Sequence, residues 1–226
     1  MLFRSKAGSR FLDLTSKNYF IGEGAGESIE NGIYNIFMGY LSGQANTDGS
    51  YNVFLGYNTG KDNIDGDRNV FLGYNAGQLN TSGAYNVFLG YESGYSNDFG
   101  NDNVFAGYHA GYSNIDGMQN VFIGRGAGLS NVGTGEGTSN IAVSGDKNVF
   151  IGNMAGNLNT HGFRNVFIGT SAGQRSTLGE DNVYMGTLAG AYTLESDNNV
   201  FLGSYCGFHM ESDSYNTFVG ARVGYD

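Results

Sequence analysis

Asn69–Gly77 reads NVFLGYNAG, and the phrase recurs 17 residues earlier and 17 residues later. Asn52–Gly60 reads NVFLGYNTG and Asn86–Gly94 reads NVFLGYESG. A short β-branched and aromatic run bounded by glycine indicates a β-strand. Because side chains alternate along a strand, the Phe points opposite to the Val and Leu, and one core cannot take both faces.

The phrase begins twelve times along the chain, and we number the repeat from its asparagine as position 1. The consensus is N-V-F-[LI]-G-Y-x-A-G-x-x-N-x-x-G-x-x, with Gly at positions 5 and 9 in every copy and Tyr184 as the one exception to Phe at position 3. Asn120 and Asn148 are 28 residues apart, or 17 plus an insertion of 11 near 133–143 (GTGEGTSNIAV). The copies begin at Asn18, Asn35, Asn52, Asn69, Asn86, Asn103, Asn120, Asn148, Asn165, Asn182, Asn199 and Asn216.

This repeat is too short for a pair of helices, and its glycines disfavour one. It predicts an all-β fold, a parallel β-solenoid (β-roll) of about twelve 17-residue coils. Each strand then pairs in parallel with the same strand one coil away, and the glycines mark corners. We expect the repeat domain to cover residues 18–226, and residues 1–17 to form an N-terminal cap or a degenerate coil.

Identical residues stack in such an array, and we expect structural ladders. Asparagine amides one coil apart can hydrogen-bond along the stack, while the functional alternative is a row of ligand-binding amides. The ladder residues that we single out are Asn52, Asn69, Asn86 and Asn103 at position 1, Phe54, Phe71, Phe88 and Phe105 at position 3, and Gly56, Gly73, Gly60 and Gly77 at the corners.

The sequence leaves open which face of the strand lies outside the coil. Burying one Phe, Val or Leu side chain is worth about 1.5–3 kcal/mol, so either column represents a large free energy. Soluble monomers rarely leave apolar stripes of that extent in water. Cyclic symmetry brings identical stripes together, and we therefore expect further copies of this chain to cover one face.

The composition narrows the range of partners. The net charge is −10 with 11 Lys plus Arg, which argues against nucleic acid. One cysteine excludes an intrachain disulfide framework. No apolar stretch approaches the length of a membrane helix, so we expect no membrane insertion in this segment.

No recurrent catalytic or metal-binding constellation stands out. His109, His161 and His209 occupy repeat positions 7, 14 and 11, whereas ligands of a repeated metal site recur at one position. The glycine-rich strings GEGAG at 22–26 and GRGAG at 124–128 lack the following helix of a phosphate loop. Scattered acidic residues favour solvated carboxylates over a calcium ladder. We expect no enzyme, no cofactor and no metal, with Cys206 a packed thiol.

Two features are candidate ligand contacts. A column of tyrosines at position 6 offers rings to sugars, with inter-chain or corner packing as the alternative. The insertion interrupts the pattern, and insertions in solenoids often lie on the binding face, with a neutral insertion as the alternative. The candidate contacts are Tyr40, Tyr57, Tyr74, Tyr91, Tyr108, Glu136 and Thr138.

The phrase N69-V-F-L-G73-Y-N-A-G77 and its relatives resemble the head domains of YadA-type trimeric autotransporter adhesins, and resemble still more the β-roll repeats of phage tail fibres. The resemblance covers about residues 18–224. It implies a left-handed roll, a homotrimer and an extracellular place, in a virion fibre or a bacterial cell-surface appendage. The departures are a period longer than that of adhesin heads and Phe where they have small residues.

From these observations we expect a structural and attachment segment of a trimeric fibre that recognises a host surface glycan or an envelope receptor. One alternative is a fibre-borne glycan depolymerase, which needs two carboxylates at a fixed separation. The other is an ice-binding β-solenoid, which needs a regular threonine face that this chain lacks.

Overall fold

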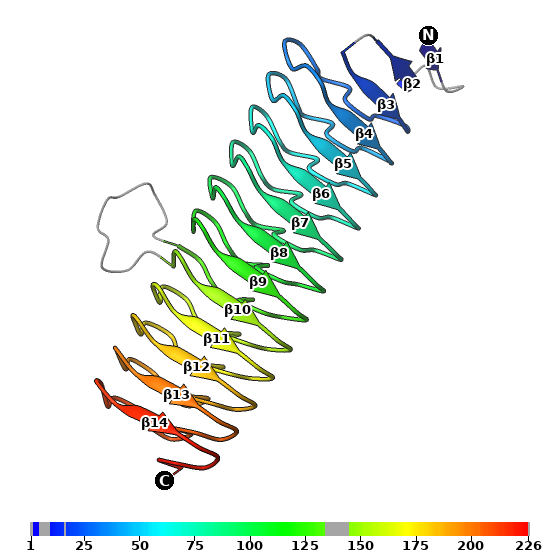
Figure 1. Ribbon diagram of the computed structural model, residues 1–226. Coiled ribbons are helices and arrows are strands. Elements are labelled where there is room, and N and C mark those ends of the chain that lie inside the picture. The colour runs from blue at the N-terminus through cyan, green and yellow to red at the C-terminus, as the bar shows by residue number, and fades with distance from the viewer. Residues whose placement is uncertain (1, 5–9, 16, 134–144, 226) are drawn as a thin grey trace.

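The computed structural model describes residues 2–4, 10–15, 17–133 and 145–225. These residues form a rod of stacked coils with one strand per coil along a single side (Figure 1). The strands join in sequence order into one 14-stranded sheet, in which β3 to β14 run parallel. Their bounds are β1 Leu2–Arg4, β2 Arg10–Leu14, β3 Tyr19–Ile21, β4 Ile36–Met38, β5 Val53–Leu55, β6 Val70–Leu72, β7 Val87–Leu89, β8 Val104–Ala106, β9 Val121–Ile123, β10 Val149–Ile151, β11 Val166–Ile168, β12 Val183–Met185, β13 Val200–Leu202 and β14 Thr217–Val219.

The pairing confirms the predicted β-solenoid with a 17-residue period. Each strand residue pairs with its equivalent in the next coil, so that Phe71 lies opposite Phe88. The register also holds across the insertion, where Val121 pairs with Val149. The additional residues therefore leave the stack of coils unchanged.

The N-terminal end of the sheet differs from the repeats. Strand β1 pairs antiparallel with β2, and β2 pairs antiparallel with β3. This hairpin covers the strand edge that β3 would otherwise expose. Exposed strand edges invite pairing with other chains, so a covered edge protects the N-terminal end of the stack.

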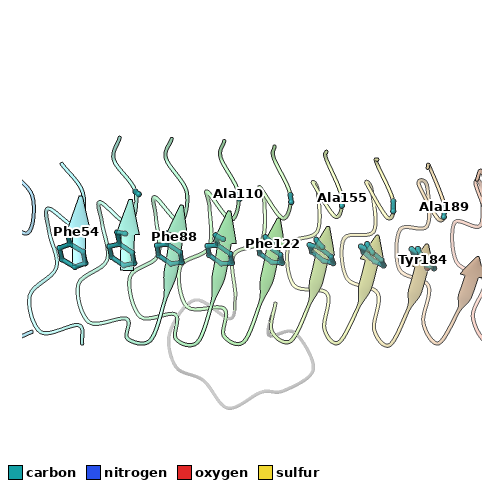
Figure 2. Close-up of a cluster of buried hydrophobic side chains, with 14 of the residues drawn as sticks. Phe54, Phe88, Ala110, Phe122, Ala155, Tyr184 and Ala189 are labelled. Carbon is teal, nitrogen blue, oxygen red and sulfur yellow. The ribbon is translucent and has the colours of Figure 1, made fainter. Parts of the chain in front are cut away.

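Phenylalanine at position 3 lies inside the coil, which answers the question that the sequence left open. Phe37 to Phe201, with Tyr184 among them, are fully buried, and Figure 2 shows the rings in one column beside the small residues of position 8. Neighbouring centroids from Phe20 to Phe218 are 4.7–5.2 Å apart and the ring planes are within 12° of parallel. The core is thus one continuous aromatic stack.

Two glycine positions make this narrow coil possible. A Cβ on Gly77 at position 9 would lie 2.5 Å from the ring of Phe71. A Cβ on Gly73 at position 5 would lie 2.3 Å from the carbonyl oxygen of Gly90 in the next coil. Both glycines also have positive φ, 57° and 139°. Only glycine combines that backbone with so close an approach.

The asparagines at positions 1 and 12 form two hydrogen-bonded ladders inside the coil. The side-chain oxygen of Asn69 accepts the backbone N–H of Asn86 at 2.9 Å, and its amide donates to the carbonyl of Gly83 at 2.7 Å. At position 12 the amide of Asn97 donates to the side-chain oxygen of Asn80 at 2.8 Å. These amides replace the backbone partners that irregular coil segments lack.

Candidate functional site

The outward strand face consists of the side chains at positions 2 and 4 of the parallel strands. Every residue in both columns lacks charge, and several are well exposed, among them Met38 at 42% and Ile123 at 40%. Position 2 carries Tyr19, Ile36, Val53, Val70, Val87, Val104, Val121, Val149, Val166, Val183, Val200 and Thr217, and position 4 carries Ile21, Met38, Leu55, Leu72, Leu89, Ala106, Ile123, Ile151, Ile168, Met185, Leu202 and Val219. The strand face is therefore one uncharged stripe, apolar from Ile36 to Leu202.

Aromatic residues flank this stripe in the N-terminal half of the rod. At position 17, the guanidinium of Arg68 lies between the rings of Tyr51 and Tyr85, at 5.2 and 5.3 Å from their centroids. The C-terminal half has polar flanks instead. Their residues are Lys147, Arg164, Asp181 and Asn198 at position 17 and Asn153, Thr170, Thr187 and Ser204 at position 6.

Arg164 and Asp181 form the best-defined ion pair on these flanks. The guanidinium donates two hydrogen bonds to the carboxylate, one of them from Nε at 2.5 Å. The hydrogen bond from Arg164 holds the pKa of Asp181 below its ordinary value. Both side chains remain well exposed to water, so the pair adds little stability.

The tyrosine column at position 6 flanks the strand face in the N-terminal half of the rod. Tyr40, Tyr57, Tyr74, Tyr91 and Tyr108 are 43–46% exposed. Their rings stack on one another at 5.0–5.2 Å, with interplanar angles of 6–19°. Both faces of the three inner rings are therefore occupied by neighbouring tyrosines, and the outward parts are ring edges and hydroxyls. Sugars stack on ring faces, so this geometry favours packing or edge contacts over face-on sugar stacking.

A carboxylate–imidazole pair lies next to this column, and the sequence pattern did not reveal it. His109 Nε2 and Glu92 Oε2 are 2.9 Å apart, both at position 7 of adjacent coils. The His109 ring also stacks on Tyr108 at 3.9 Å and contacts Tyr112 at 5.0 Å. Desolvation, followed by the charge of Glu92, raises the pKa of Tyr112. The 17-residue spacing of Glu92 and His109 was the signal that could have identified the pair.

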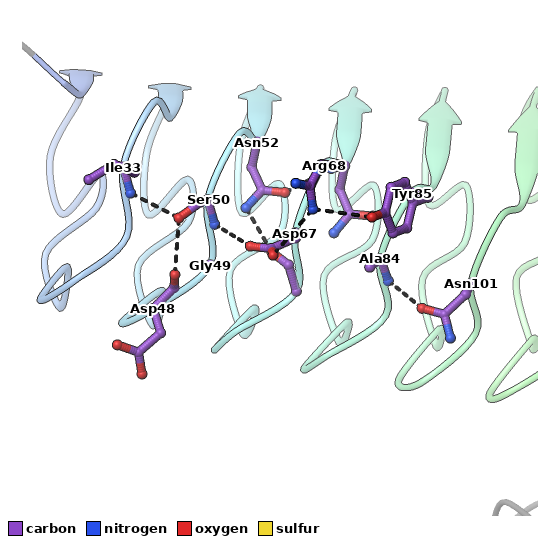
Figure 3. A network of polar contacts seen from close by, with 12 residues as sticks. Ile33, Asp48, Gly49, Ser50, Asn52, Asp67, Arg68, Ala84, Tyr85 and Asn101 are labelled. Atoms are coloured by element: carbon purple, nitrogen blue, oxygen red, sulfur yellow. Dashed lines mark hydrogen bonds and ion pairs between the residues drawn. The ribbon is translucent and has the colours of Figure 1, made fainter.

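Acidic and amide side chains at position 16 have a structural task. The carboxylate of Asp67 accepts the N–H of Ser50 at 2.7 Å, and Asn101 accepts the N–H of Ala84 at 2.7 Å (Figure 3). Asp146 accepts the N–H of Met118 in the same way. These side chains join one coil to the previous one, so Asp67 is not simply a solvated acid.

The other residues that the sequence singled out do not gather at one site. Glu136 and Thr138 lie outside the described residues. Cys206 takes the small position 8 beside the aromatic column, and its burial raises the pKa of the thiol. Within the described part of the chain, no three His, Cys, Asp or Glu side chains gather in a metal-binding group. The same residues contain no helix long and apolar enough to span a membrane.

Comparison with known proteins gives no family for this chain. No protein-family model, curated protein or solved structure shows a significant match.

Proposed function

We propose that this chain is a structural and attachment segment of a homotrimeric extracellular fibre, of the kind found in phage tail fibres and bacterial surface adhesins. The single observation that supports it most strongly is the uncharged strand face. With the Phe column inside the coil, two columns of uncharged and mostly aliphatic side chains remain on the outside along the stack.

The size of the strand face fits an interface between copies. At the observed coil spacing the stack of twelve strands is roughly 50 Å long, and the strand face with its flanks, from position 17 to position 6, is at most about 20 Å wide. That gives at most roughly 1,000 Å² per chain, which is comparable with the about 800 Å² that each partner buries in a standard interface. The tyrosines and the arginine that flank the strand face in the N-terminal half of the rod are also residue types that interfaces favour.

Three chains and a left-handed coil are proposals that come from the resemblance to trimeric β-rolls. A rod that joins its copies side by side keeps its outer walls free. Parallel ladders, stacked rings and buried amides make that rod stiff, as a fibre segment must be. Attachment to host surface glycans is the corresponding proposal for the free walls.

Light scattering on the chain at micromolar concentration tests the assembly. The proposal predicts a mass of three times 24.1 kDa, and a mass of 24.1 kDa would overturn it. Leu89→Glu places a charge on the strand face and should shift the mass to that of one chain. Leu79→Glu is the matched control, because Leu79 is equally exposed (37% against 38%) and is not on the strand face, so its mass should stay that of three chains.

A further inference from the structure

A shallow groove of about 480 Å³ lies on the wall formed by positions 11 and 13, away from the strand face. It crosses four consecutive coils. Leu79 and Ile115, each 37% exposed, supply its apolar surface. Its polar lining consists of Asp62, Thr81, Ser96 and Asp98.

The backbone around Asp98 fixes the wall of the groove. The Asp98 carbonyl accepts the N–H groups of Thr81, Ser82 and Gly83 at 3.0–3.2 Å. Asp98 donates its own N–H to the carbonyl of Ile115 at 2.8 Å. The Thr81 hydroxyl donates to Oδ1 of Asp98 and thereby orients the carboxylate, while Oδ2 takes no part in that hydrogen bond. The groove is therefore formed before any ligand arrives, which lowers the entropic cost of binding.

The lining matches a sugar chain that carries no acidic groups. Apolar side chains suit the C–H faces of sugar rings, and carboxylates and hydroxyls suit their hydroxyl and amine groups. Asp98 repels carboxylates, sulfates and phosphates, and the net charge of −10 adds to this repulsion. Asp62 contributes less, because its carboxylate lies 3.9 Å from the ammonium of Lys61. The coil spacing of about 4.8 Å is close to the length of one sugar residue, so successive coils can meet successive rings.

The carboxylates favour binding over cleavage. Asp62 and Asp98 belong to coils two steps apart, which separates them by about 9–10 Å along the rod before the offset between positions 11 and 13 is added. Acid pairs that hydrolyse glycosidic bonds are about 5–9.5 Å apart. The spacing of Asp62 and Asp98 along the rod is thus at or beyond the upper limit for such a pair.

From these contacts we infer that the groove binds a linear oligosaccharide, with amine-bearing sugars preferred and acidic sugars rejected. This inference rests on the proposed attachment function and specifies the site and the class of sugar. Asp98 is the main partner of the amines, Asp62 shares its charge with Lys61, and Leu79 and Ile115 form the surface beneath the rings.

Calorimetric titration of the whole chain with three tetrasaccharides tests it: β-linked glucosamine, β-linked N-acetylglucosamine and galacturonate. We expect the tightest binding for the amine, weaker binding for the N-acetyl sugar and none for the uronate. Asp98→Asn keeps the shape of the side chain and should weaken binding of the amine at least about tenfold, the effect of losing one charged contact. Asp65→Asn, in an exposed turn outside the groove, should bind as the original chain does.

Absence of binding to all three sugars, equal binding of the uronate, or unchanged binding by Asp98→Asn would each overturn the inference. The Leu89→Glu variant separates it from the proposed assembly. That variant should lose the trimer and keep the sugar affinity per chain, since Leu89 is not in the groove. A trimer that binds none of the three sugars would support the proposed assembly and overturn the groove as a binding site.

Discussion

At the residue scale, the coil depends on backbone conformations that the sequence pattern conceals. Positions 7 and 17 have positive φ in nearly every repeat, although residues such as Leu188 and Tyr85 occupy them. Non-glycine residues adopt this conformation at a cost of about 1–2 kcal/mol each. The invariant glycines were visible in the sequence, because steric exclusion requires one residue type. Positions 7 and 17, which carry the strain, were not visible in the sequence, because any residue that points outward is tolerated there.

Ser171 and Gly173 separate backbone strain from steric exclusion, since their φ angles are 54° and 56° in the same coil. Gly173→Ala should lower the free energy of unfolding by about 2–4 kcal/mol, because its Cβ would lie 2.4 Å from the ring of Phe167. Ser171→Gly should leave stability unchanged or raise it by up to about 1 kcal/mol. Denaturant unfolding measures both, and equal losses would contradict this account.

Tyr184 is the one polar ring in the aromatic column, and its hydroxyl makes no well-formed hydrogen bond within the described residues, although the side chains of Thr193 and Asn199 lie next to it. Burial also holds the pKa of this phenol well above its ordinary value. Tyr184→Phe should therefore raise the free energy of unfolding by about 1 kcal/mol, because it removes an unsatisfied buried group. Thermal unfolding checks this against Tyr74→Phe, whose hydroxyl is exposed and should not matter. A lower melting temperature for Tyr184→Phe would show that the hydroxyl is satisfied.

At the element scale, the strands follow from the sequence while their sidedness does not. The run Val-Phe-Leu and its 17-residue return predicted the strands and their parallel register. Periodicity alone treats the two faces of a strand alike, so it did not place Phe71. The geometry of the coil decides which face is inside, because the missing side chain of Gly77 leaves the space that the ring of Phe71 fills. The groove was also invisible, since its lining residues differ from coil to coil.

The position-12 ladder gives a pH-dependent prediction. Asn97 is fully buried and donates to the side-chain oxygen of Asn80 and to the carbonyl of Gly100. Asn97→Asp should lower stability by about 3 kcal/mol or more at neutral pH, because a buried carboxylate would face two acceptors.

Protonation restores a donor in this variant, so its folded-state pKa would lie above the unfolded value of about 3.9. The deficit is therefore smallest below that unfolded pKa and grows as pH rises through and above it. Urea unfolding of the variant and the original chain between acid and neutral pH measures the difference. A deficit that is constant with pH would refute the ladder geometry.

At the scale of the whole molecule, the rod is an array in which each coil contacts its two neighbours. The antiparallel hairpin β1–β2 covers one end, and the aromatic column crosses the insertion without a break. Such arrays gain length without a wider core, which leaves their outer faces to decide their assembly. The repeat in the sequence predicted that one face of the strand lies outside the coil, and the fold shows that it is the face of Val and Leu.

The most direct test of this account compares the reactivity of two introduced thiols. Leu89→Cys lies on the strand face, and Leu79→Cys, equally exposed in the single chain, lies in the groove. The native Cys206 is buried with a raised thiol pKa, so it should not react with the maleimide. Rates of maleimide labelling should be fast at Leu79→Cys and slow at Leu89→Cys at micromolar concentration, because in the proposed trimer other copies cover the strand face. Equal, fast labelling of both would contradict the claim that the chains meet there.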